Sequence, residues 1–429
     1  MPAGEDKRRF TRYKWVTLLT FSLMYNFAYV GRFNIVDHLS DFSDAVTVGS
    51  TQQDLIYFCL FLSYGIGSFC NGMLCRRLGG KRLVILGASI SIFANMFTVL
   101  AVNWETVFVL QIVNGYFQSM IWVGGIAILA DWWEPRECGI GVGIANFFSG
   151  LSHVTAFLLP QIILLVMSRL SWQSEIVLPM YVWGLFLILF IMFSAESPQQ
   201  CGLPPYALSA RESVYERRLQ RSADRPGGVF GFLCRHRKLM VWCLIALMSS
   251  MCRYGLLSWI PSYFQGRGEQ VIISETFSNL MFPLGMAMGT LFITWLTGTR
   301  FRHNIGLMIV WTAALCGSLV IVVPMVGISR AVLMSIFFSG FFLYGINGIL
   351  WLYAIRAGAR HYAGWAAGLL NGFAYLGAAL EFYITPMMIR RTGSVLSVFY
   401  LIELLCIGMI LCGIMVSRKD TVVEPEARG

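Results

Sequence analysis

Charged residues are scarce in this 429-residue sequence: Asp, Glu, Lys and Arg make up 13% of it, whereas 57% of the residues are hydrophobic. The mean hydropathy is +0.67. One soluble core cannot bury that much apolar surface, so the composition excludes an ordinary soluble protein. A membrane-spanning helix needs roughly 20 apolar residues. About twelve such helices therefore account for nearly the whole length and leave no room for a soluble enzyme domain.

Cysteine and catalytic patterns are also lacking. The eleven cysteines show no C-x-x-C spacing and lie mostly in apolar stretches, where free cysteine acts as a small hydrophobic residue. We therefore expect no disulfide framework, no metal site and no cofactor. No Ser/His/Asp, Asp/Asp or H-E-x-x-H arrangement occurs in the apolar runs, which argues against an enzyme. The charged N-terminus leads into an apolar run too long for a signal peptide, so we expect it to be retained.

Apolar runs bounded by charged or turn residues predict an all-α membrane protein with twelve transmembrane helices. The expected spans are 15–38, 52–74, 83–102, 106–130, 139–167, 176–194, 239–264, 275–296, 305–326, 331–355, 362–389 and 395–416. The predicted organisation is an N-terminus (1–14), a first six-helix bundle (15–194), a linker (195–238), a second six-helix bundle (239–416) and a tail (417–429). Small residues at 139–150 and 364–377 predict close helix approaches.

The distribution of basic residues predicts the orientation in the membrane. Twenty-five of the 32 Lys and Arg residues fall on the side that holds both termini and the linker, and five fall on the other side. Cytoplasmic loops are enriched in Lys and Arg, so we expect both termini and the linker to be cytoplasmic. The same bias explains the net charge of +10 without a nucleic-acid partner.

Two basic residues belong to no loop: Arg32 lies deep in the first predicted helix and Arg253 deep in the seventh. These helices are equivalent in the two halves, where repeat-built carriers place their substrate site. A charge inside a membrane helix costs at least about 2.5–3.5 kcal/mol. The functional interpretation is that both guanidinium groups bind one tetrahedral oxyanion. The structural alternatives are snorkelling of Arg32 or an ion pair with Glu381 or Glu403.

Tyrosines and one acid complete the candidate site. Tyr25 and Tyr29 precede Arg32 at i, i+4, i+7 spacing on one helix face, and Tyr64 of the second helix is placed to join them. Phenolic hydroxyls donate to phosphoryl oxygens, although tyrosine is also common at membrane interfaces. Glu381 is a candidate for proton coupling or for a counter-ion, with a neutral hydrogen-bonded acid as the alternative.

Four segments resemble the organophosphate:phosphate antiporters of the major facilitator superfamily, typified by bacterial glycerol-3-phosphate and hexose-phosphate transporters. They are YNFAYVGRFN at 25–34, NGYFQSMIW at 114–122 with the Asp-Trp-Trp at 131–133, SPQQCGLPP at 197–205 and RYGLLSWIPSY at 253–263. The resemblance implies a major facilitator fold, in which two six-helix bundles enclose one central site. It also implies that Arg32 and Arg253 match the family's two phosphoryl-binding arginines.

The resemblance extends the candidate site and shows departures from the family. The expected substrate-binding residues are Arg32, Arg253, Tyr25, Tyr29, Tyr64, Trp122, Asn146, Ser68 and Ser149. Ser68 and Ser149 stand where the family has a pocket lysine and a histidine, and Arg76 replaces an acid of a cytoplasmic motif. With up to two fewer positive charges, the site balances a monoanion better than it would in the family.

The predicted function is secondary transport of a small organic anion by alternating access, with the anion held between Arg32 and Arg253. The resemblance implies exchange of an organophosphate for inorganic phosphate. Two alternatives remain open: an organosulfonate or other monoanionic organic acid as substrate, or a transporter-like receptor for a phosphorylated ligand. We expect a monomeric multi-pass protein of the cell membrane, specifically a bacterial inner membrane, with an anionic small molecule and the lipid bilayer as its partners.

Overall fold

The computed structural model describes residues 4–37, 49–134, 137–166, 172–206, 217, 237–265, 275–326 and 330–417. Within these ranges the regular structure is helical and contains no strand. The helices are α1 (Gly4–Asp37), α2 (Ser50–Leu78), α3 (Gly80–Thr98), α4 (Trp104–Trp132), α5 (Cys138–Val166), α6 (Trp172–Phe193), η2 (Pro198–Cys201), α9 (Arg237–Gln265), α10 (Glu275–Thr299), α11 (Ile305–Val320), α12 (Val322–Met325), α13 (Arg330–Thr392) and α14 (Leu396–Ser417).

Local sequence signals fix several helix ends. Asn103 caps α4, because its side-chain oxygen accepts a hydrogen bond from the backbone N–H of Thr106 at 2.9 Å. Asn304 caps α11 in the same way through the N–H of Leu307 at 3.1 Å. Gly79 separates α2 from α3 with a φ of 85°, a conformation that a residue with a side chain adopts at a cost. These residues place the helix boundaries where the chain turns at the ends of the bundle.

Among the described residues, eleven helical segments are long and apolar enough to cross a membrane. The first helix, α1, is not among the eleven, although it is 34 residues long. It includes a charged N-terminal part that the sequence analysis had assigned to a separate segment, and it carries the buried Asn26 and Arg32. Because α1 packs against α5 and α6, these polar side chains face protein rather than lipid.

The long element α13 holds two of the predicted spans, Arg330–Gly358 and Tyr362–Thr392. The first runs parallel to α10, since Gly285 meets Phe337 and Gly289 meets Phe341. The second runs antiparallel to α2, because it passes from a contact near Cys75 to an ion pair with Asp54. We call the two spans α13a and α13b. The chain reverses direction between them, because a Cβ atom added at Gly358 would lie 2.5 Å from the Cα of Ala363, five residues later, far closer than a continuous helix allows.

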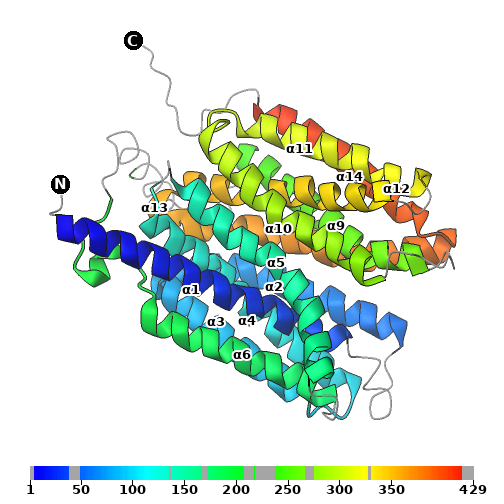
Figure 1. The fold of residues 1–429 in the computed structure, drawn as a ribbon, viewed down its shortest axis with the longest axis horizontal. Helices are drawn as coiled ribbons and strands as arrows, with labels where there is room; N and C mark the ends of the chain where they lie inside the picture. The colour runs from blue at the N-terminus through cyan, green and yellow to red at the C-terminus, as the bar shows by residue number, and fades with distance from the viewer. Residues whose placement is uncertain are drawn as a thin grey trace.

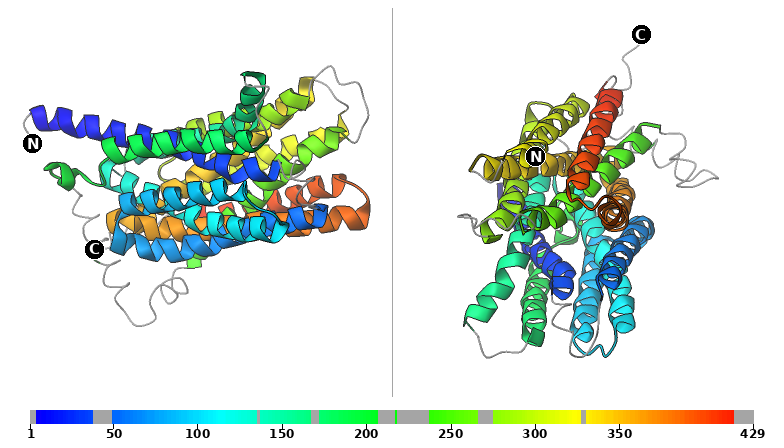
Figure 2. Two further views of the ribbon diagram at one scale, coloured as in Figure 1. Left: turned by 90° about the horizontal axis from the view of Figure 1, so that it is seen from below. Right: turned by 90° about the vertical axis from the view of Figure 1, so that its right-hand side faces the viewer.

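The helices form two bundles (Figures 1 and 2). Helices α1–α6 pack with one another from the blue to the darker green part of the chain, and α9–α14 pack from the light-green α9 to the red α14. The bundles meet where α2 packs on α13b, α5 on α10, and α4 on α13. This arrangement leaves the inner faces of α1, α4, α9 and α13 at the centre of the molecule.

Small residues bring the two bundles together, and the contacts lie within the segments 139–150 and 364–377, where the sequence predicted close helix approaches. A Cβ atom added at Gly150 on α5 would lie 2.6 Å from the Cα of Ala287 on α10. A Cβ at Gly368 on α13b would lie 2.5 Å from the backbone oxygen of Ser68 on α2. Real Cβ atoms do not approach backbone this closely, so glycine permits both contacts.

The bundles touch at both ends of the molecule. At one end the guanidinium carbon of Arg76 lies 4.5 Å from the ring centroid of Tyr362, and Lys14 pairs with Glu137 at 2.7 Å within the first bundle. At the other end Arg390 pairs with Asp54 at 3.3 Å. The contact between α2 and α13b therefore runs along the full length of both helices.

The start of α1 and the end of α14 lie at the same end of the molecule. Gly139, which closely follows Glu137, contacts Gly298 near the end of α10. Beyond α10, the side chain of Asn304 accepts a hydrogen bond from Ser417 at 3.0 Å. An even number of crossings agrees with this placement, and the assignment of this end to the cytoplasm stays a prediction.

Candidate functional site

The two intramembrane arginines lie at the interface between the bundles. Arg32 on α1 has 0% of its surface exposed and Arg253 on α9 has 5%. Both arginines contact the same residue, Tyr254. A guanidinium nitrogen of Arg32 donates to the Tyr254 hydroxyl at 3.5 Å, and the guanidinium carbon of Arg253 lies 4.4 Å from the centroid of the same ring. The structure thus brings together the two arginines that the sequence singled out.

Arg32 is held by side chains from both bundles. Its Nε donates to the side-chain oxygen of Gln118 on α4 at 2.6 Å, and its Nη1 donates to the hydroxyl of Tyr375 on α13b. The guanidinium carbon lies 4.2 Å from the ring centroid of Tyr29 and 4.6 Å from that of Tyr64. Its Nη2 is buried and has no hydrogen-bond partner among the described residues. One arm of the guanidinium fork is therefore unused.

Arg253 has a similar environment on the other side of the interface. Its Nη2 donates to the hydroxyl of Ser250 at 3.4 Å, and the ring centroid of Tyr344 lies 5.2 Å from its guanidinium carbon. Its Nε is buried without a hydrogen-bond partner in the described part of the chain. The described ion pairs, Lys14 with Glu137 and Arg390 with Asp54, involve neither intramembrane arginine.

The deep acids lie elsewhere. Glu381 on α13b is buried, and one of its carboxylate oxygens accepts a hydrogen bond from the indole N–H of Trp259 at 3.0 Å. A carboxylate oxygen of Glu403 on α14 would lie 3.0 Å from a Cβ added at Gly317 on α11, so this acid sits within the second bundle. The ion pairs considered in the sequence analysis are therefore not formed. A role of Glu381 in coupling stays a prediction.

The predicted tyrosines cluster around Arg32. Tyr25 meets Tyr29 edge-on, with ring centroids 5.5 Å apart, and Tyr64 stacks on Tyr375 at 3.8 Å. Tyr25 also packs against Trp122 on α4 at 4.8 Å. All of these rings are buried. The cluster encloses the guanidinium group in aromatic faces, which attract a cation, and hydroxyls, which accept hydrogen bonds from it.

Ser68, Asn146 and Ser149 each form a hydrogen bond across the bundle interface. The amide of Asn371 donates to Ser68 at 3.1 Å, and the amide of Asn347 donates to Asn146 at 2.9 Å. The hydroxyls of Ser149 and Tyr344 lie 2.7 Å apart. These three pairs connect α2 and α5 with α13, and we refer to them as the cross-bundle pairs.

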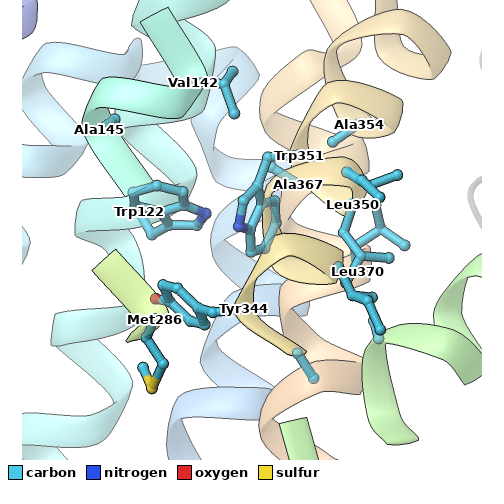
Figure 3. Packing of buried hydrophobic residues seen from close by; sticks show 14 of the residues in the cluster. Trp122, Val142, Ala145, Met286, Tyr344, Leu350, Trp351, Ala354, Ala367 and Leu370 are labelled. Carbon is cyan, nitrogen blue, oxygen red and sulfur yellow. The ribbon is translucent and has the colours of Figure 1, made fainter. Parts of the chain in front are cut away.

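Several residues of the site were not singled out by the sequence analysis. They are Gln118, Tyr254, Tyr344, Trp351, Tyr375, Asn347 and Asn371. His153 on α5 also belongs to this region, since its ring packs 4.8 Å from that of Tyr29. Most of these residues lie on the second bundle. Figure 3 shows part of this region, where Trp122, Tyr344 and Trp351 gather among buried aliphatic side chains.

The chemistry of this site is that of an anion receptor. Two desolvated guanidinium groups without a described acidic partner leave positive charge inside the protein, which is unfavourable unless an anion compensates it. The two unpartnered nitrogens are strong donors, and buried donors in proteins normally have acceptors. A tetrahedral oxyanion presents several acceptor oxygens and matches this demand.

Comparison with known proteins decides the family. Residues 18–380 match the sequence profile of the Major Facilitator Superfamily. The chain belongs to the Major Facilitator Superfamily. Membership of this superfamily makes the protein a multi-pass membrane protein and a secondary transporter rather than an enzyme, as the sequence analysis predicted.

Individual superfamily relatives are distant. The glycerol-3-phosphate transporter of Bacillus subtilis (strain 168) is 22% identical over 351 residues, which cover 77% of this chain and 76% of the relative. A protein of Cupriavidus necator named as a probable sulfoacetate transporter is 24% identical, covering 87% and 86%. The solved structure of the E.coli fucose:proton symporter has a TM-score of 0.69 at 13% identity, covering 95% of this chain and 100% of that chain. The structural likeness supports the superfamily fold.

Proposed function

We propose that this transporter carries a small organic anion across the membrane, with a phosphoryl or sulfonyl head bound between Arg32 and Arg253. One observation carries the proposal: each arginine is buried and keeps one guanidinium nitrogen without a partner in the described residues. An oxyanion bound at both nitrogens satisfies these donors and balances the two positive charges. The aromatic walls keep water away and so strengthen these contacts.

We propose an organophosphate exchanged for inorganic phosphate as the principal activity. The similarity to glycerol-3-phosphate transporters supports this class, as do the sequence motifs around Arg32 and Arg253. A monoanionic organosulfonate is the second candidate. Two observations favour it: Ser68 and Ser149 bear no charge and bond to neutral partners, and one relative is named for sulfoacetate.

The proposed mechanism is alternating access. The glycine contacts at Gly150 and Gly368 bring the helices of the two bundles together without interlocking side chains. The bundles can therefore separate at these contacts without rearranging long side chains. A bound anion reduces the repulsion between the two arginines and so favours closure around it. In this proposal the end that holds the start of α1 faces the cytoplasm, as the basic residues predict.

The test combines binding and transport. Purified protein is titrated with phosphate, glycerol 3-phosphate and ethanesulfonate while its thermal unfolding is followed, since a ligand at one hundred times its Kd adds about 2.7 kcal/mol of stability. Arg253→Lys keeps the charge but removes the guanidinium fork, and we expect it to weaken binding at least tenfold. Arg300→Lys, the same exchange at an exposed arginine just after α10, serves as the charge-matched control and leaves binding unchanged.

Transport is measured in vesicles that contain the purified protein alone. Exchange of labelled phosphate for an internal phosphate ester, abolished by Arg253→Lys, supports the antiporter. Uptake of a sulfonate without phosphate exchange supports the second candidate. Binding without any transport indicates a receptor instead, and the absence of binding by every anion refutes the proposed site.

A further inference from the structure

Two tryptophans from equivalent helices meet at the bundle interface beside the arginine site. Trp122 lies on α4 and Trp351 on α13a, which are the fourth helices of the first and second bundles. Their ring centroids are 5.3 Å apart with an interplanar angle of 65°, and only 2% and 3% of their surfaces are exposed. Figure 3 shows the nitrogen of each indole on the side that faces the other ring.

Neither indole N–H has a hydrogen-bond partner among the described residues. Buried tryptophan normally places its N–H on an acceptor, because burying an amide-like donor without one is costly. Trp132 illustrates this, since its N–H donates to the backbone oxygen of Ala195 at 2.8 Å. The N–H of Trp133 also lacks a partner among the described residues, but that ring packs against Trp15 within the first bundle. Two unpartnered donors that face each other from separate bundles therefore require an explanation.

Each tryptophan lies one helical turn from a residue of the site, Gln118 beside Arg32 in one case and Asn347 in the other. Trp122 follows Gln118 by four residues on α4, a rise of about 6 Å. On α13a, Trp351 follows Asn347 by four residues, and Asn347 takes part in a cross-bundle pair with Asn146. A short molecule whose head lies at the arginines reaches the two indoles with its other end.

The donors determine what that other end must be. An indole nitrogen donates a hydrogen bond and never accepts one. A hydroxyl placed between two indoles would accept from them but bring a further donor of its own. A carboxylate only accepts and has two oxygens, one for each N–H. Val142 and Met286 belong to the same buried apolar cluster as the two indoles, and such surroundings strengthen hydrogen bonds to a charged acceptor.

We propose that Trp122 and Trp351 bind the distal carboxylate of the substrate, so that this transporter prefers short organic acids with an oxyanion head at one end and a carboxylate at the other. The proposal rests on the proposed function, because the arginines must hold the head. In this proposal the tryptophan pair determines specificity for the tail of the substrate, whereas the arginines recognise only the head.

The test uses ligands that share a head and differ at the tail. Two pairs are suitable: 3-phosphoglycerate with glycerol 3-phosphate, and 3-sulfopropionate with 3-hydroxypropanesulfonate. Kd values are measured by calorimetry with the full-length protein. We expect wild type to bind the carboxylate member of each pair at least tenfold more tightly, because a hydrogen bond to a charged group contributes about tenfold or more in affinity.

Phenylalanine variants isolate the indole donors. Trp351→Phe and Trp122→Phe keep an aromatic ring and the charge of the protein, so each is expected to weaken carboxylate binding about tenfold while hydroxyl-tailed ligands change less than threefold. Trp183→Phe is the matched control, since Trp183 is buried in the first bundle and donates to the sulfur of Met24 at 3.5 Å. The unfolding temperature without ligand verifies that each variant is folded.

The outcomes separate this proposal from the proposed function. Loss of the carboxylate preference in both interface variants, with Trp183→Phe like wild type, supports the carboxylate site. Equal binding of both tails by wild type, or a preference that survives in both variants, overturns it and leaves the arginine site intact if Arg253→Lys still weakens binding at least tenfold. Failure of wild type to bind any of the four ligands overturns the proposed function and this inference together.

Discussion

A methyl group at position 368 tests whether the interface between the bundles opens. Gly368 on α13b packs on α2, and a Cβ there would lie 2.5 Å from the Ser68 oxygen and 2.7 Å from the Gly72 Cα. Ordinary contacts need about 3.5 Å, so Gly368→Ala requires the helices to part by roughly 1 Å. Overpacking of this kind costs about 1–3 kcal/mol. The strain is relieved by moving one bundle away from the other, without unfolding either.

A comparison with two other glycines makes this reasoning quantitative. A Cβ at Gly289 would lie 2.0 Å from the backbone oxygen of Phe341, but this contact between α10 and α13a lies inside one bundle. Gly289→Ala is therefore expected to lower the unfolding temperature more than Gly368→Ala does. Gly184 on α6 has no atom within 4 Å of an added Cβ. Gly184→Ala is the control and is expected to be neutral or to stabilise by up to about 1 kcal/mol.

The assay is thermal unfolding of the purified variants together with substrate uptake in vesicles. Gly368→Ala is expected to unfold within a few degrees of wild type but to transport at least fivefold more slowly, because closure of α2 on α13b becomes unfavourable by about 1 kcal/mol or more. The reasoning is refuted if Gly368→Ala destabilises the protein as much as Gly289→Ala, or if it transports at the wild-type rate.

Three further predictions concern polar groups. Glu381→Gln should keep anion binding and most of the stability, since an amide oxygen still accepts from Trp259, whereas Glu381→Leu should lower stability by about 1–3 kcal/mol in thermal unfolding. Arg76→Ala should remove the contact with Tyr362 and weaken the closure of α2 on α13b at that end by about 0.5–1 kcal/mol. A cysteine introduced at that end of the interface should then react faster with a thiol reagent, and an unchanged rate of labelling would contradict this. Arg390→Gln should change stability by no more than about 1 kcal/mol, and a larger loss in unfolding experiments would mean that this exposed pair is not solvent-screened.

The helices and the two arginines were predictable because their signals stand out from the background. Each predicted span overlaps a described helical segment, and eleven of the twelve segments are long and apolar enough to be identified by that signal alone. Arg32 and Arg253 are conspicuous because charge is rare in such runs. The length of α1 was not predicted: its charged first turns are helical although they carry no apolar signal.

The second half of the site was not predictable in the same way. Tyr344, Trp351 and Tyr375 look like ordinary membrane aromatics in the sequence. Only the rotation of α13a and α13b turns the two tyrosines toward the arginines and Trp351 toward Trp122. Glycine patterns predicted where helices approach but not which helices do so. A comparison of equivalent helices would have drawn attention to Trp351, because Trp122 had already been noted in the fourth helix of the first bundle.

The neutrality of the cross-bundle pairs has a consequence for electrical behaviour. Ser68 with Asn371, Asn146 with Asn347, and Ser149 with Tyr344 carry no formal charge, so breaking them moves no charge through the membrane field. The field then acts on the two arginines and their cargo, at about 2.3 kcal/mol per charge for each 100 mV. A dianion cancels both guanidinium charges and makes the loaded step insensitive to voltage, whereas a monoanion leaves one positive charge and a measurable current.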